Sequence, residues 1–294
     1  MRMATPASGV ARVHAHLAEM GVAALSLYKA ACFTRRLNSR LRARGDETID
    51  AYADRLDRDP AEREQLVAAL SIGVTAFFRN PEAWRRLAGA IDAMGRLPRF
   101  DAWSAGCSTG EEAYSAALLM SRLAERGLVG EWRVVGTDLD ARAIETARRG
   151  RYPRRAGPSI ETVVGPVAVT VDGTSLEFPI ELTRRVTFRP GDVSRPGQIG
   201  AFDLVICRNV LIYFGEAGQA QVVDNLVRAL RIGGLLMLGK AELAAGAASA
   251  SAMRVGPWFA PITKIGSPLT DHRQSSTVMS RNAVGGSRTS DGSS

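Results

Sequence analysis

Histidine and cysteine are scarce in this sequence of 294 residues. Of its three histidines, His14 and His16 both lie near the N-terminus, so neither a histidine-based metal site nor a catalytic triad is expected. The three cysteines are Cys32, Cys107 and Cys207. They are too few and too widely spaced for a zinc site or a disulfide framework, which favours a reducing compartment and no bound metal.

Long apolar runs are also missing, since none approaches the roughly 18–20 residues of a membrane-spanning helix. The short apolar stretch at residues 20–27 follows Glu19 and lacks a cationic leader or a cleavage site, so it predicts a buried helix and no signal peptide. Hydrophobic residues make up 46% of the chain and charged residues 23%, as in ordinary globular proteins. We therefore expect a cytoplasmic protein without membrane insertion.

Acidic residues are outnumbered by basic ones, and the net charge of +8 predicts an acidic partner. No nucleic-acid-binding motif is present, so an acidic protein surface is favoured over nucleic acid. One predicted helix concentrates this positive charge. Its residues Phe33, Leu37 and Leu41 recur every four positions and should face inward, which leaves a basic outer face formed by Arg35, Arg36, Arg40, Arg42 and Arg44. This face is either a docking surface or an ordinary solvated helix face.

Helical patterns fill the first part of the chain. We expect disorder at residues 1–10 and a helical domain at residues 11–80. Asp59-Pro60 and Asn80-Pro81 each combine a capping side chain with a proline at the first helical position. Residues 266–294 are rich in serine, glycine and arginine and nearly free of apolar residues, which predicts a disordered tail.

Strands and helices alternate after Phe100, which predicts a parallel α/β domain over residues 81–265. A hairpin signal around Asp172-Gly173 indicates a small antiparallel β-subdomain inserted at about residues 151–184. The strands of the parallel sheet are expected near residues 100–105, 132–138, 185–189, 202–207 and 234–239, with helices near 110–126, 140–149 and 216–231.

A glycine-bearing turn joins a predicted strand to a predicted helix within Trp103–Tyr114. Ligands of open parallel sheets lie at such strand ends, and Gly106 and Gly110 would let the backbone approach a ligand closely. Asp138, at the end of the next strand, can accept hydrogen bonds from both hydroxyls of a ribose. The dinucleotide fingerprint G-x-G-x-x-G is missing, and acidic residues at the helix start favour a cationic nucleoside such as S-adenosylmethionine over a pyrophosphate. A plain structural turn is the alternative.

Four segments, taken together and in order, resemble the CheR family, the S-adenosylmethionine-dependent protein-glutamate O-methyltransferases of chemotaxis receptors. Ser71–Arg79 contains Thr-x-Phe-Phe-Arg, and Trp103–Tyr114 contains Trp-Ser-x-x-x-Ser-Thr-Gly-Glu-Glu. Val134–Asp140 contains Thr-Asp-Leu-Asp, and Phe202–Phe214 contains Cys-Arg-Asn-Val-Leu-Ile-Tyr-Phe. The resemblance runs from about residue 21 to 264. It implies a helical N-terminal domain followed by a Rossmann-like methyltransferase domain with an inserted β-subdomain.

The resemblance also assigns roles around the first two motifs. Thr75 and Arg79 match cofactor-contacting positions of the family. Gly73 stands where the family usually has asparagine, so backbone or water is expected to replace one cofactor hydrogen bond there. Glu111 matches the acid that meets the methionine part of the cofactor, with Glu112 as a second candidate.

Further roles fall on the later strands. Asp138 matches the ribose ligand, Asp192-Val193 the segment that flanks the adenine, and Arg208-Asn209 the strand end beneath the methyl group. Arg79 and Arg208 are candidates for orienting the acceptor carboxylate. Tyr213 either lines the methyl channel or packs as an aromatic at a helix entrance.

The implied reaction transfers a methyl group to glutamate carboxylates in the acidic helical region of a receptor and leaves S-adenosylhomocysteine. A glutamate with a pKa of about 4.3 is ionised at neutral pH, so direct in-line attack needs no general base, in keeping with the few histidines. The acidic receptor favours the docking interpretation of the basic patch. A monomer is expected.

Two departures from the family pattern keep alternatives open. Gly239–Glu242 reads Gly-Lys-Ala-Glu where the family commonly has Gly-His-Ser-Glu, and residues 151–189 match poorly. Together with Gly73, the poor match motivates a non-catalytic S-adenosylmethionine-binding regulatory module as the first alternative. A methyltransferase acting on a small molecule is the second, although it would not need a basic docking surface.

Overall fold

The computed structural model of the chain describes residues 8–71, 73–165, 169–171, 173–195, 200–240, 242 and 259–261, with side chains left out at 169–171 and 259–261. The first helix begins at Gly9, so the predicted disorder at residues 1–10 does not extend to its last two positions. The remainder of that segment and the predicted tail at residues 266–294 lie outside the described residues. Along the part of the chain that is described, no helix is both long and apolar enough to cross a membrane.

The helical region forms its own hydrophobic core. Phe33, Leu37 and Leu41 are buried in it, as the four-residue spacing predicts. The Asp59 side chain accepts a hydrogen bond from the backbone N–H of Glu62, which confirms the predicted helix start. Its elements are α1 (Gly9–Glu19), the 3₁₀ helix η1 (Ala23–Leu27), α2 (Ala30–Arg44), α3 (Ile49–Arg58) and α4 (Pro60–Leu70).

The larger sheet has the strand order β6-β2-β1-β7-β8-β9, and the predicted parallel α/β domain is confirmed. All neighbouring strands pair in parallel except β9, which is antiparallel to β8. The chain proceeds from β1 outward to β2 and β6 and then returns to β7, so the strand order reverses between β1 and β7. The bounds are β1 Leu97–Ala105, β2 Val129–Asp138, β6 Val186–Pro190, β7 Phe202–Cys207, β8 Leu230–Leu238 and β9 Phe259–Pro261.

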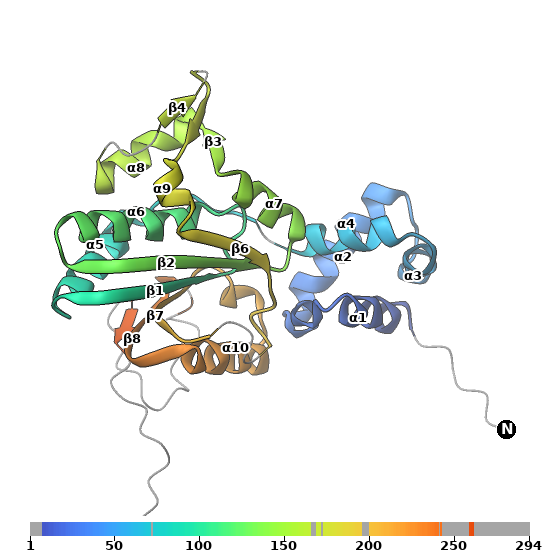
Figure 1. Ribbon diagram of the computed structural model, residues 1–294. Helices are drawn as coiled ribbons and strands as arrows, with labels where there is room; N and C mark the ends of the chain where they lie inside the picture. The colour runs from blue at the N-terminus through green and yellow to red at the C-terminus, as the bar shows by residue number, and fades with distance from the viewer. Residues whose placement is uncertain are drawn as a thin grey trace, which may run out of the picture. The chain divides into compact units, whose positions relative to one another are not determined.

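Helices cover both faces of this sheet (Figure 1). Alternate residues of β1 point to opposite layers, since Phe100 and Ala102 join one hydrophobic cluster while Trp103 and Ala105 join the other. The first cluster includes residues of α5 and α6, and the second includes residues of α10 and η1. These helices and α7, which packs against β6 and β2, span Pro81–Asp92 (α5), Glu111–Glu125 (α6), Ala141–Arg149 (α7) and Glu216–Arg228 (α10).

The inserted subdomain is only partly the β structure that its sequence predicts. Three strands pair antiparallel in the order β3-β5-β4, but helices accompany them. Gly173 lies in the predicted hairpin turn, whereas Asp172 lies outside the described residues. Aromatic rings at Tyr152 and Phe178 anchor the subdomain against Tyr114 of α6. The elements are β3 Arg151–Pro153, η2 Arg154–Ala156, α8 Gly157–Val164, β4 Val169–Val171, β5 Ser175–Glu177 and α9 Ile180–Thr183.

Candidate cofactor site

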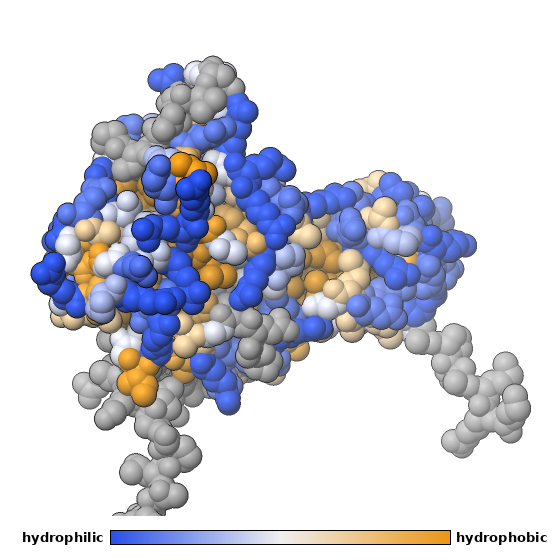
Figure 2. All heavy atoms as spheres, viewed as in Figure 1, coloured by the Kyte–Doolittle hydropathy of each residue, from blue (hydrophilic) through white to orange (hydrophobic). Residues whose placement is uncertain are grey.

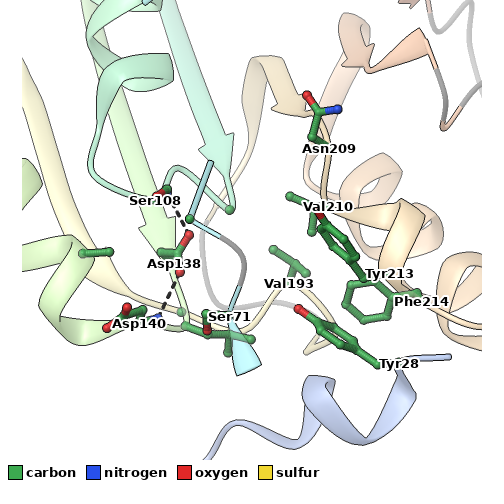
Figure 3. A pocket seen from close by; sticks show the side chains of 15 residues that line it. Tyr28, Ser71, Ser108, Asp138, Asp140, Val193, Asn209, Val210, Tyr213 and Phe214 are labelled. Atoms are coloured by element: carbon green, nitrogen blue, oxygen red, sulfur yellow. Dashed lines mark hydrogen bonds between the residues drawn. The ribbon is translucent and has the colours of Figure 1, made fainter. Parts of the chain in front are cut away.

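A pocket lies where the strand order reverses, at the carboxyl ends of β1, β2 and β7. This is the position at which open α/β sheets bind ligands. Figure 3 shows Asp138, Ser108 and Asp140 on one side of the pocket and Val210, Tyr213 and Phe214 on the other. Its lining also includes Gly73, Gly106, Leu139, Gly191, Val193 and Asn209.

The turn after β1 requires glycine for two different reasons. Gly106 has a φ of +77°, and a Cβ there would lie 2.6 Å from a methyl carbon of Val210. Gly110 has a φ of +98°, and a Cβ there would lie 2.8 Å from the Cβ of Ala147 in α7. Gly106 therefore lies on the pocket, as predicted, whereas Gly110 allows close packing between helices instead of close approach to a ligand.

Asp138 is the acid of this pocket. One of its carboxylate oxygens accepts the backbone N–H of Ser108 at 2.8 Å, and the other accepts that of Asp140 at 3.0 Å. Burial raises the pKa of Asp138, although these two N–H groups act in the opposite direction. Because each oxygen keeps a further lone pair, the carboxylate can also accept hydrogen bonds from a ribose.

A second pocket continues from the first. Gly106, Ser108, Asn209 and Val210 line both of them. The second pocket adds the predicted residues Thr75, Arg79 and Arg208 together with Glu112, Val74 and Ala76. The two pockets thus bring nearly all of the predicted site residues into one elongated site.

Of the two acids at the start of α6, Glu112 lines the site and Glu111 does not. Glu111 accepts a hydrogen bond from the Thr109 hydroxyl at 2.6 Å and lines neither pocket. Glu112 lines the second pocket and accepts a hydrogen bond from Ser104. Neighbouring helix positions point about 100° apart, so the two acids leave the helix in different directions. Burial raises the pKa of Glu112 to about 7, against the opposing effect of Arg208.

Arg208 is buried beside Glu112, with 3.8 Å between a guanidinium nitrogen and a carboxylate oxygen. A second guanidinium nitrogen donates to the side-chain oxygen of Asn80 at 3.0 Å. Burial lowers the pKa of Arg208. The helix start predicted at Asn80-Pro81 is confirmed, since Asn80 is the N-cap residue of α5 and Pro81 begins the helix, but the Asn80 side chain makes no cap hydrogen bond and instead accepts one from Arg208.

The side chains of Asp192 and Val193 have different surroundings. Val193 lines the first pocket, as the predicted adenine-side position requires. The buried carboxylate of Asp192 does not line that pocket; it accepts hydrogen bonds from the backbone N–H of Ala24, at 3.1 Å, and from Ser194. Its side chain therefore ties η1 to the sheet domain, while the place of the Asp192-Val193 segment beside the adenine stays a prediction.

Tyr213 lines the first pocket, and so does Tyr28 of the helical region, with 6.0 Å between the centroids of the two rings (Figure 3). Tyr28 was not among the site residues predicted from the sequence. Lys29 donates its backbone N–H to the carbonyl of Tyr213 at 2.8 Å, and Tyr28 bridges to Phe214. Tyr28 and Lys29 lie within residues 21–264, over which the sequence resembles the family, and that resemblance was the signal available for finding this wall of the pocket.

Two serines add polar capacity to the first pocket that sequence reasoning missed. The hydroxyls of Ser71 and Ser108 are buried and have no hydrogen-bond partner among the described residues. A Cβ at Gly73 would lie 3.1 Å from the Ser108 hydroxyl, so the missing asparagine leaves room beside it. Unpartnered hydroxyls and acids at both ends, with apolar and aromatic walls between, fit a nucleoside that carries cationic groups.

Comparisons with known proteins agree with this site. The family model described as the S-adenosylmethionine-binding domain of CheR methyltransferase matches residues 73–257, and that of the CheR all-alpha domain matches residues 23–71. A chemotaxis protein methyltransferase of Listeria monocytogenes is 30% identical over 226 residues, covering 74% of this chain and 83% of the relative. One from Klebsiella aerogenes is 33% identical, covering 74% and 77%.

A further relative is named for a different process. The probable biofilm formation methyltransferase WspC of Pseudomonas aeruginosa is 35% identical over 204 residues, covering 66% of this chain and 47% of the relative. Together the two family models therefore span the helical region and the sheet domain. This chain belongs to the CheR methyltransferase family, and S-adenosylmethionine is its cofactor.

Proposed function

We propose that this enzyme methylates glutamate side chains in the cytoplasmic helical region of chemotaxis receptors. The observation that carries the proposal is the continuity of the two pockets, because the second one leads from the cofactor site to Arg79 and Arg208. In this arrangement the ribose lies on Asp138 and the adenine beside Val193. The methionine end lies near Glu112.

Arg79 is the better candidate for orienting the acceptor carboxylate. No carboxylate of the described residues lies within ion-pair distance of it, and its guanidinium donates to the carbonyl of Val74 at 3.1 Å. The charge of Arg208, in contrast, already faces Glu112. A guanidinium without an acidic partner can hold an incoming carboxylate through two parallel hydrogen bonds.

The chemistry needs no base from the protein. When bound, S-adenosylmethionine supplies an electrophilic methyl group, to which a carboxylate oxygen bonds in line as the carbon–sulfur bond breaks and its electron pair goes to sulfur. An anion and a cation both lose their charge, so exclusion of water favours the reaction. The rings of Tyr213, Tyr28 and Phe214 line the pocket and can exclude water from it.

The docking surface for the receptor is smaller than the sequence predicts. Arg40 and Arg44 are paired with the buried Glu62, and Arg36 donates to the carbonyls of Ala69 and Ser71. Figure 2 shows hydrophilic residues over much of the visible face of the helical region. The exposed basic side chains of α2 and its start that have no partner among the described residues are Lys29, Arg35 and Arg42.

The test combines methyl-labelled S-adenosylmethionine, this protein and the cytoplasmic fragment of a chemoreceptor, followed by mild base. Release of labelled methanol is expected, because carboxyl methyl esters hydrolyse under these conditions. Label that resists base would mean another acceptor atom and would reject glutamate methylation. Cofactor binding without transfer to any receptor fragment of the same genome would favour the regulatory module.

A further inference from the structure

The loop that follows β7 supplies four residues to the cofactor pocket, namely Asn209, Val210, Tyr213 and Phe214. Asn209 has a φ of +60°, a left-handed conformation that asparagine adopts more readily than most residues with a side chain. Hydrogen bonds from side chains outside the loop hold its backbone on this path. The groups that hold this loop therefore influence the pocket without touching its contents.

The Glu242 carboxylate holds this loop by accepting hydrogen bonds from backbone N–H groups of the loop. One of its carboxylate oxygens lies 2.7 Å from the backbone nitrogen of Val210 and 3.3 Å from that of Leu211. Glu242 is 3% exposed and lines neither pocket of the site. A Cβ on Gly239 would collide with the second carboxylate oxygen of Glu242, so the glycine at the end of β8 makes room for the acid.

Gln219 of α10 holds the same loop by its carbonyl groups. Its side-chain nitrogen donates to the carbonyl of Leu211 at 2.9 Å and to that of Phe214 at 3.2 Å. Glu242 and Gln219, which are distant in sequence from the loop, thus both hold its backbone by hydrogen bonds. Among the side chains described, Glu242 is the only acceptor for the N–H groups of Val210 and Leu211, so its loss is harder to compensate than the loss of Gln219.

We propose that Glu242 is a positioning residue of the cofactor site, which fixes Asn209 and Tyr213 against the bound cofactor by accepting the N–H groups of Val210 and Leu211. The inference rests on the proposed placement of the cofactor along this loop. It does not depend on which acceptor is methylated. Glu242 also lies near Arg208, so its negative charge helps to keep that buried guanidinium charged.

The first test measures the affinity for S-adenosylhomocysteine by calorimetry, without any acceptor. Glu242→Ala leaves two N–H groups unpaired, and we expect the affinity to fall by about tenfold to a hundredfold. Glu242→Gln keeps an oxygen at the same reach and is expected to recover most of that loss. Glu131→Gln, an exposed glutamate on β2, is the matched control and should bind as the unmodified protein does.

Unchanged affinity in Glu242→Ala, or a Gln variant as impaired as the Ala variant, would overturn the proposal. If Glu242→Ala fails to fold, Glu242→Asp decides, because it keeps the charge but withdraws the oxygen by one methylene; affinity equal to that of the unmodified protein would then reject positioning. Methyl-transfer kinetics add a second readout. The KM for S-adenosylmethionine should rise while that for the receptor fragment stays constant, whereas general loss of structure would raise both.

Discussion

Two aspartates on neighbouring strands, the buried Asp101 and the half-buried Asp138, have opposite surroundings. Asp101 lies in the middle of β1, level with the start of β7, and accepts hydrogen bonds from Arg133 at 2.7 Å and Arg231 at 2.8 Å. Burial would raise the pKa of Asp101, but these arginines and Arg99 lower it below its usual value. Asp138 ends β2 with backbone N–H partners only, and its pKa is raised.

The difference separates an acid that serves the fold from one that serves a ligand. The three arginines that neutralise Asp101 come from β1, β2 and β8, so this cluster fastens strands together. Among the described residues, no cation lies at the Asp138 carboxylate, which faces a pocket. An unneutralised acid at a strand end is therefore the better indicator of a binding site.

The largest effect is expected from Asp138→Ala. Two charge-assisted hydrogen bonds to the ribose, each worth roughly 1.5–3 kcal/mol, would be lost, so cofactor affinity should fall by at least about a hundredfold. Calorimetric titration with S-adenosylhomocysteine measures this. Equal affinities for the variant and the unmodified protein would refute the assignment of the ribose to Asp138.

Asp101→Ala should lower the stability of the fold and leave the cofactor affinity unchanged, the reverse of the effect expected for Asp138→Ala. The change leaves three half-exposed arginines near one another without their common anion, and the free energy of unfolding should fall by about 2 kcal/mol. Urea denaturation measures the loss, and cofactor affinity should stay unchanged under native conditions. A weaker affinity with intact stability would mean that the two aspartates do not divide their roles in this way.

Much of this contrast could be predicted from the sequence. Asp138 follows a strand pattern and precedes a helix, so its place at the sheet's carboxyl edge follows from the topology of parallel sheets. The family resemblance put Glu111 ahead of Glu112, whereas Glu112 is the one that lines the site. The two positions differ only by helix phase, which depends on where α6 begins. Tyr28 could not be placed, since its approach to Tyr213 depends on long-range contacts between the helical region and the loop after β7.

Glu112, the acid at the other end of the site, predicts that cofactor affinity depends on pH. Burial raises the pKa of Glu112 to about 7, so its ionised fraction grows as the pH rises from 6 to 8. An ionised Glu112 attracts the cofactor's ammonium group, and affinity should increase by up to about tenfold over this range. The same shift destabilises the unliganded fold as the pH rises from the usual glutamate value to 7, because the folded protein prefers the protonated acid.

Glu112→Gln separates these effects. The variant should lose most of the pH dependence of binding between pH 6 and 8 and bind at pH 8 about as weakly as the unmodified protein does at pH 6. Calorimetry at both pH values provides the measurement. If the slope persists in the Gln variant, the titrating group lies elsewhere and Glu112 does not meet the ammonium.

The smallest effect concerns the docking surface, where charges are exposed instead of buried. Arg35→Ala combined with Arg42→Ala removes two cations of α2 that have no partner among the described residues. Exposed charges contribute little each and are screened by salt, so the KM for a receptor fragment should rise only about threefold to tenfold at low ionic strength, and less at high salt. Cofactor affinity should not change.

The matched control removes the same charge from exposed positions outside the helical region, Arg126→Ala with Arg228→Ala. If net charge alone attracts an acidic receptor, both double variants should raise the KM equally, and α2 would then have no special role. A rise confined to Arg35 and Arg42 would locate recognition on that helix. Together with a loss of cofactor affinity in Asp138→Ala alone, it would show that acceptor and cofactor are bound by separate regions of the chain.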